Sequence, residues 1–106
     1  MTQEQKIQEM QILEQGLQQI LMQKQAFYME LSESEAALKE LEKSSDEVFK
    51  VIGQLMIKSD KKKIQEDLEK KKKLLNIRLK TFETQEQNMS EKVEKIRQEL
   101  MKEMKK

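Results

Sequence analysis

Cysteine, histidine, proline and tryptophan are all absent from this chain of 106 residues. The lack of cysteine excludes a disulfide framework and thiol chemistry, and it suits a reducing compartment. The lack of histidine removes the side chain that most often acts as a general base or metal ligand near neutral pH. The sequence also shows no glycine-rich phosphate loop and no metal-ligand spacing. We therefore expect a protein that is not an enzyme and that carries no cofactor and no metal.

Long apolar runs are absent as well. No stretch approaches the ~20 apolar residues that crossing a bilayer requires, and the first five residues do not open an apolar run. We expect a soluble, cytosolic protein without a signal peptide and without membrane partners. The 21 basic and 20 acidic residues leave a net charge of +1, whereas a general nucleic-acid binder would show a basic excess.

What the chain contains instead is charge and helical periodicity. Charged residues make up 39% of the sequence and hydrophobic residues only 36%. This composition, with apolar residues at regular intervals, is typical of a long helix or a coiled coil. Disorder is the alternative for so polar a chain, but the periodicity and the near-neutral net charge argue against it. We predict one domain over residues 1–106.

Two long helices are predicted, over residues 3–43 and 60–104. In the first, apolar residues alternate in steps of three and four, with Lys24 and Ser34 at two of the seam positions. In the second, apolar residues recur every seven residues, which indicates a left-handed supercoiled seam. Gly16 is the weak point of the first helix, and tolerance in a long helix explains it more simply than a hinge. The seam residues are Met10, Leu13, Leu17, Ile20, Phe27, Leu31, Leu38 and Leu41, then Leu68, Leu75, Leu79, Phe82, Met89, Val93, Ile96 and Leu100.

The first 25 residues differ in composition from the rest of the chain. They hold nine glutamines and little charge. A surface of this kind is polar, yet it is more easily desolvated than the charged surface that follows it.

Between the helices, residues 46–58 predict a β-hairpin. The stretch is rich in Val, Ile and Phe, which favour strands, and Gly53 with Gln54 suits the two-residue loop of a type II′ turn. This loop places Ile52 opposite Leu55 and leaves both faces of the ribbon mostly apolar. A two-stranded hairpin of this kind needs partners. The alternative is a buried helical turn that continues the flanking helices, and the central glycine argues against it.

The short connection requires the two helices to run antiparallel, and the charges agree. Residues 30–47 hold seven acidic residues and two lysines (net −5), whereas residues 58–73 hold eight lysines and four acidic residues (net +4). Folding back at the hairpin lays these blocks side by side. Exposed pairs stabilise by only ~0.2–1 kcal/mol each, so the blocks set partner and register while the seam supplies stability. Nucleic-acid binding by the lysine block is an alternative, and it predicts a steep salt dependence.

At the end of the coil far from the hairpin, ~60 Å away by helix rise, both helices carry apolar residues. Ile12 and Met101 lie off the seam, so this tip has more apolar surface than a two-helix seam requires. The chain's eight methionines are flexible side chains, favoured where varied apolar partners bind. The alternative is that the tip residues merely complete the seam. The predicted tip consists of Ile7, Met10, Ile12 and Leu13 from the first helix and Ile96, Leu100, Met101 and Met104 from the second.

The hairpin and its flanking helices together resemble a known family. Residues 48–50 (V-F-K), Gly53 and residues 55–58 (L-M-I-K) look like the V-[YF]-K…G…L-[VI]-K core of the prefoldin β-type subunits. That group also includes the eukaryotic prefoldin subunit numbered six. Phe49 stands where the family often has tyrosine, and Met56 interrupts a smoother aliphatic run. The resemblance spans the whole chain, and the single hairpin implies the β type, because α-type subunits carry two hairpins.

The resemblance implies an assembly and a function. Two α-type and four β-type subunits would join their hairpins into a β-barrel body, from which the coiled coils hang free. The coil tips, formed by the tip residues named above, would bind unfolded client polypeptides without ATP and pass them to a group II chaperonin. By the same resemblance, the oligomer interface falls on Val48, Phe49, Val51, Ile52, Gly53, Leu55, Met56 and Ile57.

The predicted architecture is mainly α: a long antiparallel two-helix coiled coil joined by a short β-hairpin that assembles with other subunits into a β-barrel body. A function of a different class also fits this architecture. The chain would then be a structural coiled coil that tethers or spaces other proteins, with the hairpin as its dimerisation element. Such a scaffold would not suppress the aggregation of an unrelated denatured protein.

Overall fold

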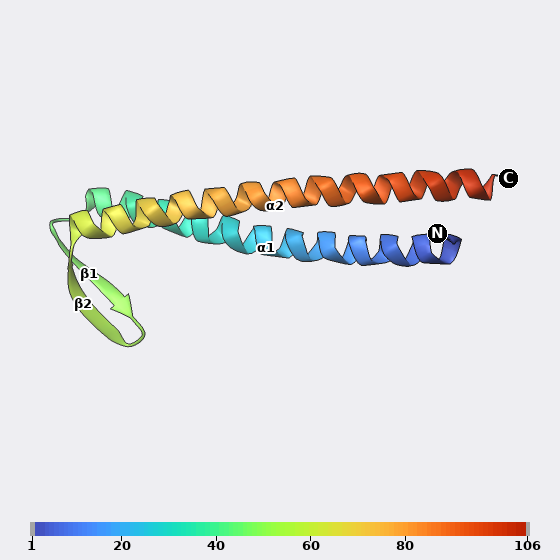
Figure 1. Cartoon of the computed structure of the whole chain (residues 1–106). Coiled ribbons are helices and arrows are strands. Elements are labelled where there is room, and N and C mark those ends of the chain that lie inside the picture. The colour runs from blue at the N-terminus through green and yellow to red at the C-terminus, as the bar shows by residue number, and fades with distance from the viewer. Residues whose placement is uncertain (1, 106) are drawn as a thin grey trace. The chain divides into compact units, whose positions relative to one another are not determined.

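The computed structural model describes residues 2–105 and contains two helices joined by a β-hairpin (Figure 1). Helix α1 spans Gln3–Lys43, strands β1 and β2 span Glu47–Ile52 and Leu55–Asp60, and helix α2 spans Lys61–Met104. The predicted order of helix, hairpin and helix is confirmed. The strands begin and end slightly later than the expected hairpin, so α2 begins one residue later than predicted.

The chain forms two compact units. One joins Met1–Ala26 to Leu79–Lys106, and the other is Phe27–Arg78, which includes the hairpin. In each unit a segment of α1 packs against a segment of α2 that runs in the opposite direction (Figure 1). The antiparallel pairing predicted from the short connection is therefore confirmed.

Contacts inside each unit show how the segments are aligned. In the first unit, the Lys24 ammonium of α1 lies 3.0 Å from the Glu86 carboxylate of α2. In the second unit, the Arg78 guanidinium of α2 lies over the Phe27 ring of α1, 5.9 Å from the ring centroid. A cation over an aromatic face at this distance is attracted by the ring's electron density.

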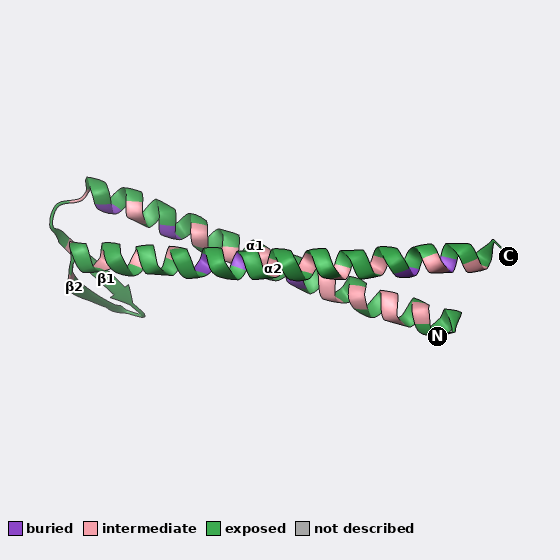
Figure 2. Ribbon diagram, turned by 45° about the horizontal axis from the view of Figure 1, so that its top comes forward, coloured by how far each residue is buried: buried purple, intermediate pink, exposed green. Residues whose placement is uncertain are grey.

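The core is a seam of side chains between the paired segments, visible as regular buried and half-buried bands along both helices (Figure 2). Ser34 is 3% exposed and the Lys24 side chain is 14% exposed, which confirms that both residues occupy seam positions. The serine is small, and the lysine stem lies along the seam while its ammonium meets a carboxylate. The most buried apolar side chains are Ile20, Leu79, Ile96 and Leu100 in the first unit and Leu41 and Leu75 in the second.

Polar contacts close the connection between the hairpin and the helices. The Asp60 carboxylate accepts a hydrogen bond from the Lys62 backbone N–H at 3.2 Å, so Asp60 caps the N-terminus of α2. The lysines that follow this cap oppose the helix dipole. The ammonium of one of them, Lys61, donates a hydrogen bond to the backbone carbonyl oxygen of Ser44 (2.9 Å), just beyond the end of α1. The lysine thereby ties the start of α2 to the end of α1.

The hairpin has the register that the sequence predicts. Ile52 pairs with Leu55, and the pairing continues in step along both strands. Gly53 has a φ of 58°, whereas the φ of Gln54 is not positive. A positive φ at the first loop residue alone is the geometry of a type II′ turn, which suits the right-handed twist of the two strands.

Gly16 makes room for a side chain of the partner segment. Helix α1 runs unbroken through this glycine. A Cβ atom on Gly16 would overlap the terminal methyl carbon of Met89 in α2, within the same unit. The structure therefore shows close helix packing at this glycine rather than a break in the helix.

Two glycine substitutions test these assignments. Gly16→Ala is expected to stabilise the chain by about 0.5–1 kcal/mol, because alanine favours the helix and the flexible end of Met89 can move aside. Gly53→Ala is expected to destabilise it by about 1–2 kcal/mol, because alanine is strained at positive φ. Urea denaturation followed by circular dichroism measures both changes. A Gly16→Ala protein less stable than the parent would show that Met89 cannot move.

Candidate functional site

The hairpin exposes apolar side chains on both of its faces. Their exposed fractions run from 45% for Ile57 to 69% for Met56, and Val48 is half-buried. Successive side chains of a strand point to opposite faces, so the exposed groups line both sides of the sheet. Their burial would be favourable by ~25 cal/mol per Å². The exposed members are Phe49, Val51, Ile52, Leu55, Met56 and Ile57.

Both strands of the hairpin are edge strands. The described residues form one sheet of two strands, β1 and β2, so each strand pairs on one side only. The free side presents backbone N–H and C=O groups that can pair with a strand of another chain. An isolated two-stranded sheet is marginally stable in water. The hairpin therefore offers both apolar surface and hydrogen-bonding edges to a partner.

The apolar surface of the hairpin continues onto the helices of the second unit. Two hollows of about 460 and 590 Å³ lie between the hairpin and the helical segments. Phe49 lines both hollows, together with Ala37, Ile64 and Leu68, and its side chain is half exposed. The hairpin is thus not closed onto the helices, and its root remains open to apolar contacts.

The predicted tip residues divide into two groups in the first unit, which contains both termini (Figure 1). One group lies in the seam, where Met10 and Leu13 are half-buried and Ile96 and Leu100 are buried. The other group, called here the exposed tip group, has exposed fractions from 42% to 79% and consists of Ile7, Ile12, Met101 and Met104. The surface open to a partner is narrower than the predicted set, because the seam uses half of it.

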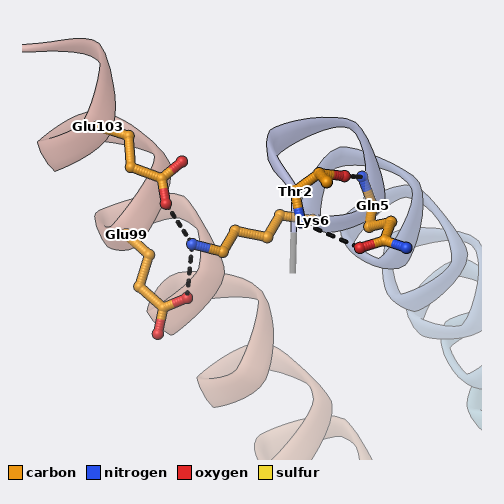
Figure 3. Close-up of polar contacts among 5 residues, drawn as sticks. All are labelled: Thr2, Gln5, Lys6, Glu99 and Glu103. Carbon is orange, nitrogen blue, oxygen red and sulfur yellow. Dashed lines mark hydrogen bonds and ion pairs between the residues drawn. The ribbon is translucent and has the colours of Figure 1, made fainter.

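Lys6 ties α1 to α2 beside this group (Figure 3). Its side chain is 14% exposed, and its ammonium forms ion pairs with the carboxylates of Glu103 and, at 3.6 Å, of Glu99. The hydrogen bond to Glu103 is the main reason why the pKa of Lys6 lies above its ordinary value. Thr2 and Gln5 shape the helix turn that carries Lys6, since each side chain accepts a hydrogen bond from the other's backbone N–H, at 3.0 and 3.1 Å.

The acidic block and the lysine block both lie in the second unit. The Lys72 ammonium is 3.8 Å from the Glu35 carboxylate, and the Lys58 ammonium is 3.7 Å from the Glu47 carboxylate. These pairs join residues of the two blocks, as the opposite charges predict. Both pairs are substantially exposed, so their contribution to stability is small.

Two features of the structure do not follow from the sequence pattern. The glutamate partners of Lys6 and Lys24 could have been found only with the antiparallel register in hand, since each lysine sits far from its partner in sequence. The second feature is a set of exposed apolar side chains outside the hairpin and the tip, which do not follow the seam spacing. These are Leu21, Met22, Tyr28, Met29, Leu74 and Ile77.

The acidic side chains of residues 2–105 form no cluster suited to a metal ion. Within the same residues, neither helix has an apolar stretch long enough to cross a membrane. The candidate sites are the exposed apolar surfaces of the hairpin and of the tip.

Comparison with known proteins identifies a family to which the chain is similar. Residues 4–106 match the family model described as prefoldin subunit. The chain is 37% identical to the prefoldin subunit beta of Thermococcus onnurineus over 82% of this chain and 77% of the relative. It is 36% identical to the prefoldin subunit beta of Methanothrix thermoacetophila over 87% of this chain and 78% of the relative. The crystal structure of the prefoldin beta subunit from Thermococcus strain KS-1 is similar with a TM-score of 0.86 and 30% identity, covering 94% of this chain and 90% of that one.

Replacing Lys6 tests whether this lysine holds the tip closed. In Lys6→Gln, we expect amide hydrogen exchange over residues 8–13 to be about two- to fivefold faster, because the helix ends separate more often without the ion pairs. Lys39→Gln, at an exposed lysine of the same helix, is the matched control and should leave these amides unchanged. Equal exchange rates in Lys6→Gln and the parent would contradict the proposed role of Lys6.

The contribution of Lys6 also has a defined pH dependence. Because its pKa in the folded chain is raised above 10.5, the stabilisation is complete below that pH and is lost as the pH rises through the folded-state pKa. The difference in melting temperature between the parent and Lys6→Gln should therefore be constant near neutral pH and shrink above pH 10.5. A difference that grows at high pH would contradict this assignment.

Proposed function

The chain belongs to the prefoldin subunit family, and on that premise we propose that it is part of a chaperone that holds unfolded polypeptides without ATP. In this proposal the coil tips bind the client, and the complex passes it to a group II chaperonin in the cytoplasm. The observation that carries the proposal is the presence of exposed apolar surface in each unit, at the hairpin of one and at the tip of the other.

The hairpin supports the assembly step of this proposal. Strands from the hairpins of other subunits would pair with the free edges of β1 and β2, and the exposed apolar side chains would be buried inside the resulting barrel. We propose a hetero-hexamer of two α-type and four β-type subunits, in which this chain is a β-type subunit. The 30% identity to a solved β subunit over 94% of the chain supports that assignment.

The exposed tip group supports the holding step. None of its four side chains is charged, and two of them are methionines. Methionine is flexible and polarisable, so such a surface adapts to apolar segments of different sequence. Burial of apolar surface is reversible and requires no covalent chemistry, which is consistent with capture and release without an enzymatic step.

The holding step is tested by Met101→Ser with Met104→Ser in the assembled complex. We expect assembly to be unchanged and the affinity for a chemically denatured client to fall about tenfold, because the two side chains supply on the order of 1–2 kcal/mol of apolar burial. The measurement is the concentration of complex that half-suppresses light scattering by the aggregating client.

The matched control is Met29→Ser with Leu74→Ser, which removes exposed apolar side chains of similar size from the second unit. This variant should suppress aggregation as the parent does. Unchanged suppression by the Met101 and Met104 variant would move the client surface away from the tip. Failure of the parent complex to suppress aggregation at all would favour a tethering coiled coil.

A further inference from the structure

The glutamine-rich part of α1 carries a second stripe that the seam does not use. On the side of α1 opposite the seam, seven exposed residues follow one another at spacings that alternate between three and four. The helical period of 3.6 residues places them on one face. This face, called here the α1 outer face, consists of Gln5, Gln8, Ile12, Gln15, Gln19, Met22 and Ala26. All seven belong to the first unit.

The α1 outer face has no charged residue, in a chain of which 39% is charged. The corresponding face of α2 in the same unit provides the comparison. It has seven exposed residues at the same spacing, and three of them are charged: Thr81, Thr84, Asn88, Glu91, Lys95, Gln98 and Lys102. A solvated helix face ordinarily resembles that of α2, because charged side chains favour exposure to water. Exposure to water alone therefore does not explain why the α1 outer face lacks the charged residues that the α2 face has.

The side chains of the α1 outer face suit contact with a polypeptide. Ile12 is 67% exposed and Met22 is 69% exposed, so both have apolar surface to bury. The amides of Gln8, Gln15 and Gln19 can donate and accept hydrogen bonds, and they cost less to desolvate than charged groups, whereas the Gln5 oxygen already accepts from the Thr2 backbone. Such a face can pair with backbone amides and apolar side chains of many sequences.

The size and charge of the face indicate its occupant. From Gln5 to Ala26 the helix rises ~32 Å, and a strip ~10 Å wide of that length offers on the order of 300 Å². A stable dimer needs ~800 Å² from each partner, so the face is too small to hold two copies together permanently. The lack of formal charge complements an uncharged partner and gives no attraction for nucleic acid or an anionic membrane.

We propose that the α1 outer face binds uncharged segments of unfolded polypeptides, and that client contact extends from the tip along α1. Ile12 belongs to both surfaces and makes them continuous. The inference rests on the proposed holding function, which it deepens by naming the segment of client that binds and where it lies. An uncharged segment is favoured because a charged one would lose its hydration against a face that offers no opposite charge.

A pair of matched double variants tests this inference in the assembled complex. Gln15→Lys with Met22→Lys places two positive charges on the α1 outer face, whereas Thr84→Lys with Gln98→Lys places two on the outer face of α2. The probe is a fluorescein-labelled, unstructured 20-residue peptide of Leu, Phe, Ser and Gly. We expect its Kd to rise about tenfold in the α1 variant, because bound peptide would cover the new charges, and to stay within about twofold in the α2 variant.

The outcomes separate the inference from the function on which it rests. If the Met101 and Met104 variant weakens peptide binding and the α1 variant does not, the inference is overturned and the proposed function stands. If the parent complex does not bind the peptide, the proposed function itself fails. A change in the sedimentation mass of the α1 variant would assign the face to contact between copies, which also overturns the inference.

Photo-crosslinking gives a readout that does not depend on charge or on the stability of a variant. Benzoylphenylalanine at Gln19, on the α1 outer face, should crosslink the peptide more strongly than the same residue at Asn88 on α2. Crosslinking at the two positions in equal yield would contradict the proposal.

Discussion

A two-stranded hairpin with apolar side chains on both faces cannot bury its own surface in a chain whose other described elements are two helices. The seam of the second unit uses apolar residues of the helices, such as Leu41 and Leu75, and leaves those of the hairpin exposed. The free edges of β1 and β2 add backbone groups that pair only with another strand. In the proposed assembly, the hairpins of several subunits would remove both deficits together. The membership in the prefoldin subunit family agrees with this dependence on other chains.

A two-helix seam buries one stripe of each helix and leaves the remaining faces free for other roles. The seam alone does not fix the axial register of the two helices, because apolar residues that recur every seven residues meet equally well when one helix is shifted by seven. The ion pairs of Lys24 with Glu86 and of Lys6 with the glutamates of α2 remove that ambiguity in the first unit. Polar residues in the seam thus contribute alignment where apolar residues contribute stability.

The sequence predicted the fold well because its signals are local and periodic. The steps of three and four gave the seam, including Ser34, and the Gly53-Gln54 dipeptide gave the register of the hairpin. The contact of Gly16 with Met89 and the partners of Lys6 were not predictable, because they depend on which residues of two distant segments meet. The spacing also divided the predicted tip correctly: the seam positions Ile96 and Leu100 are buried, whereas Ile12 and Met101, which lie off the seam, are exposed.

The measurement that tests this account most directly is the solution mass of the chain, alone and mixed with an α-type prefoldin subunit, by sedimentation equilibrium. The account predicts a hexamer that forms best with the α-type subunit. It also predicts loss of that hexamer in Phe49→Asp with Ile52→Asp, because unpaired charges would be buried in the barrel, while Gln54→Asp in the exposed turn leaves it intact. Two results would contradict the account: a stable dimer whose mass does not change when the α-type subunit is added, or a hexamer that still forms in Phe49→Asp with Ile52→Asp.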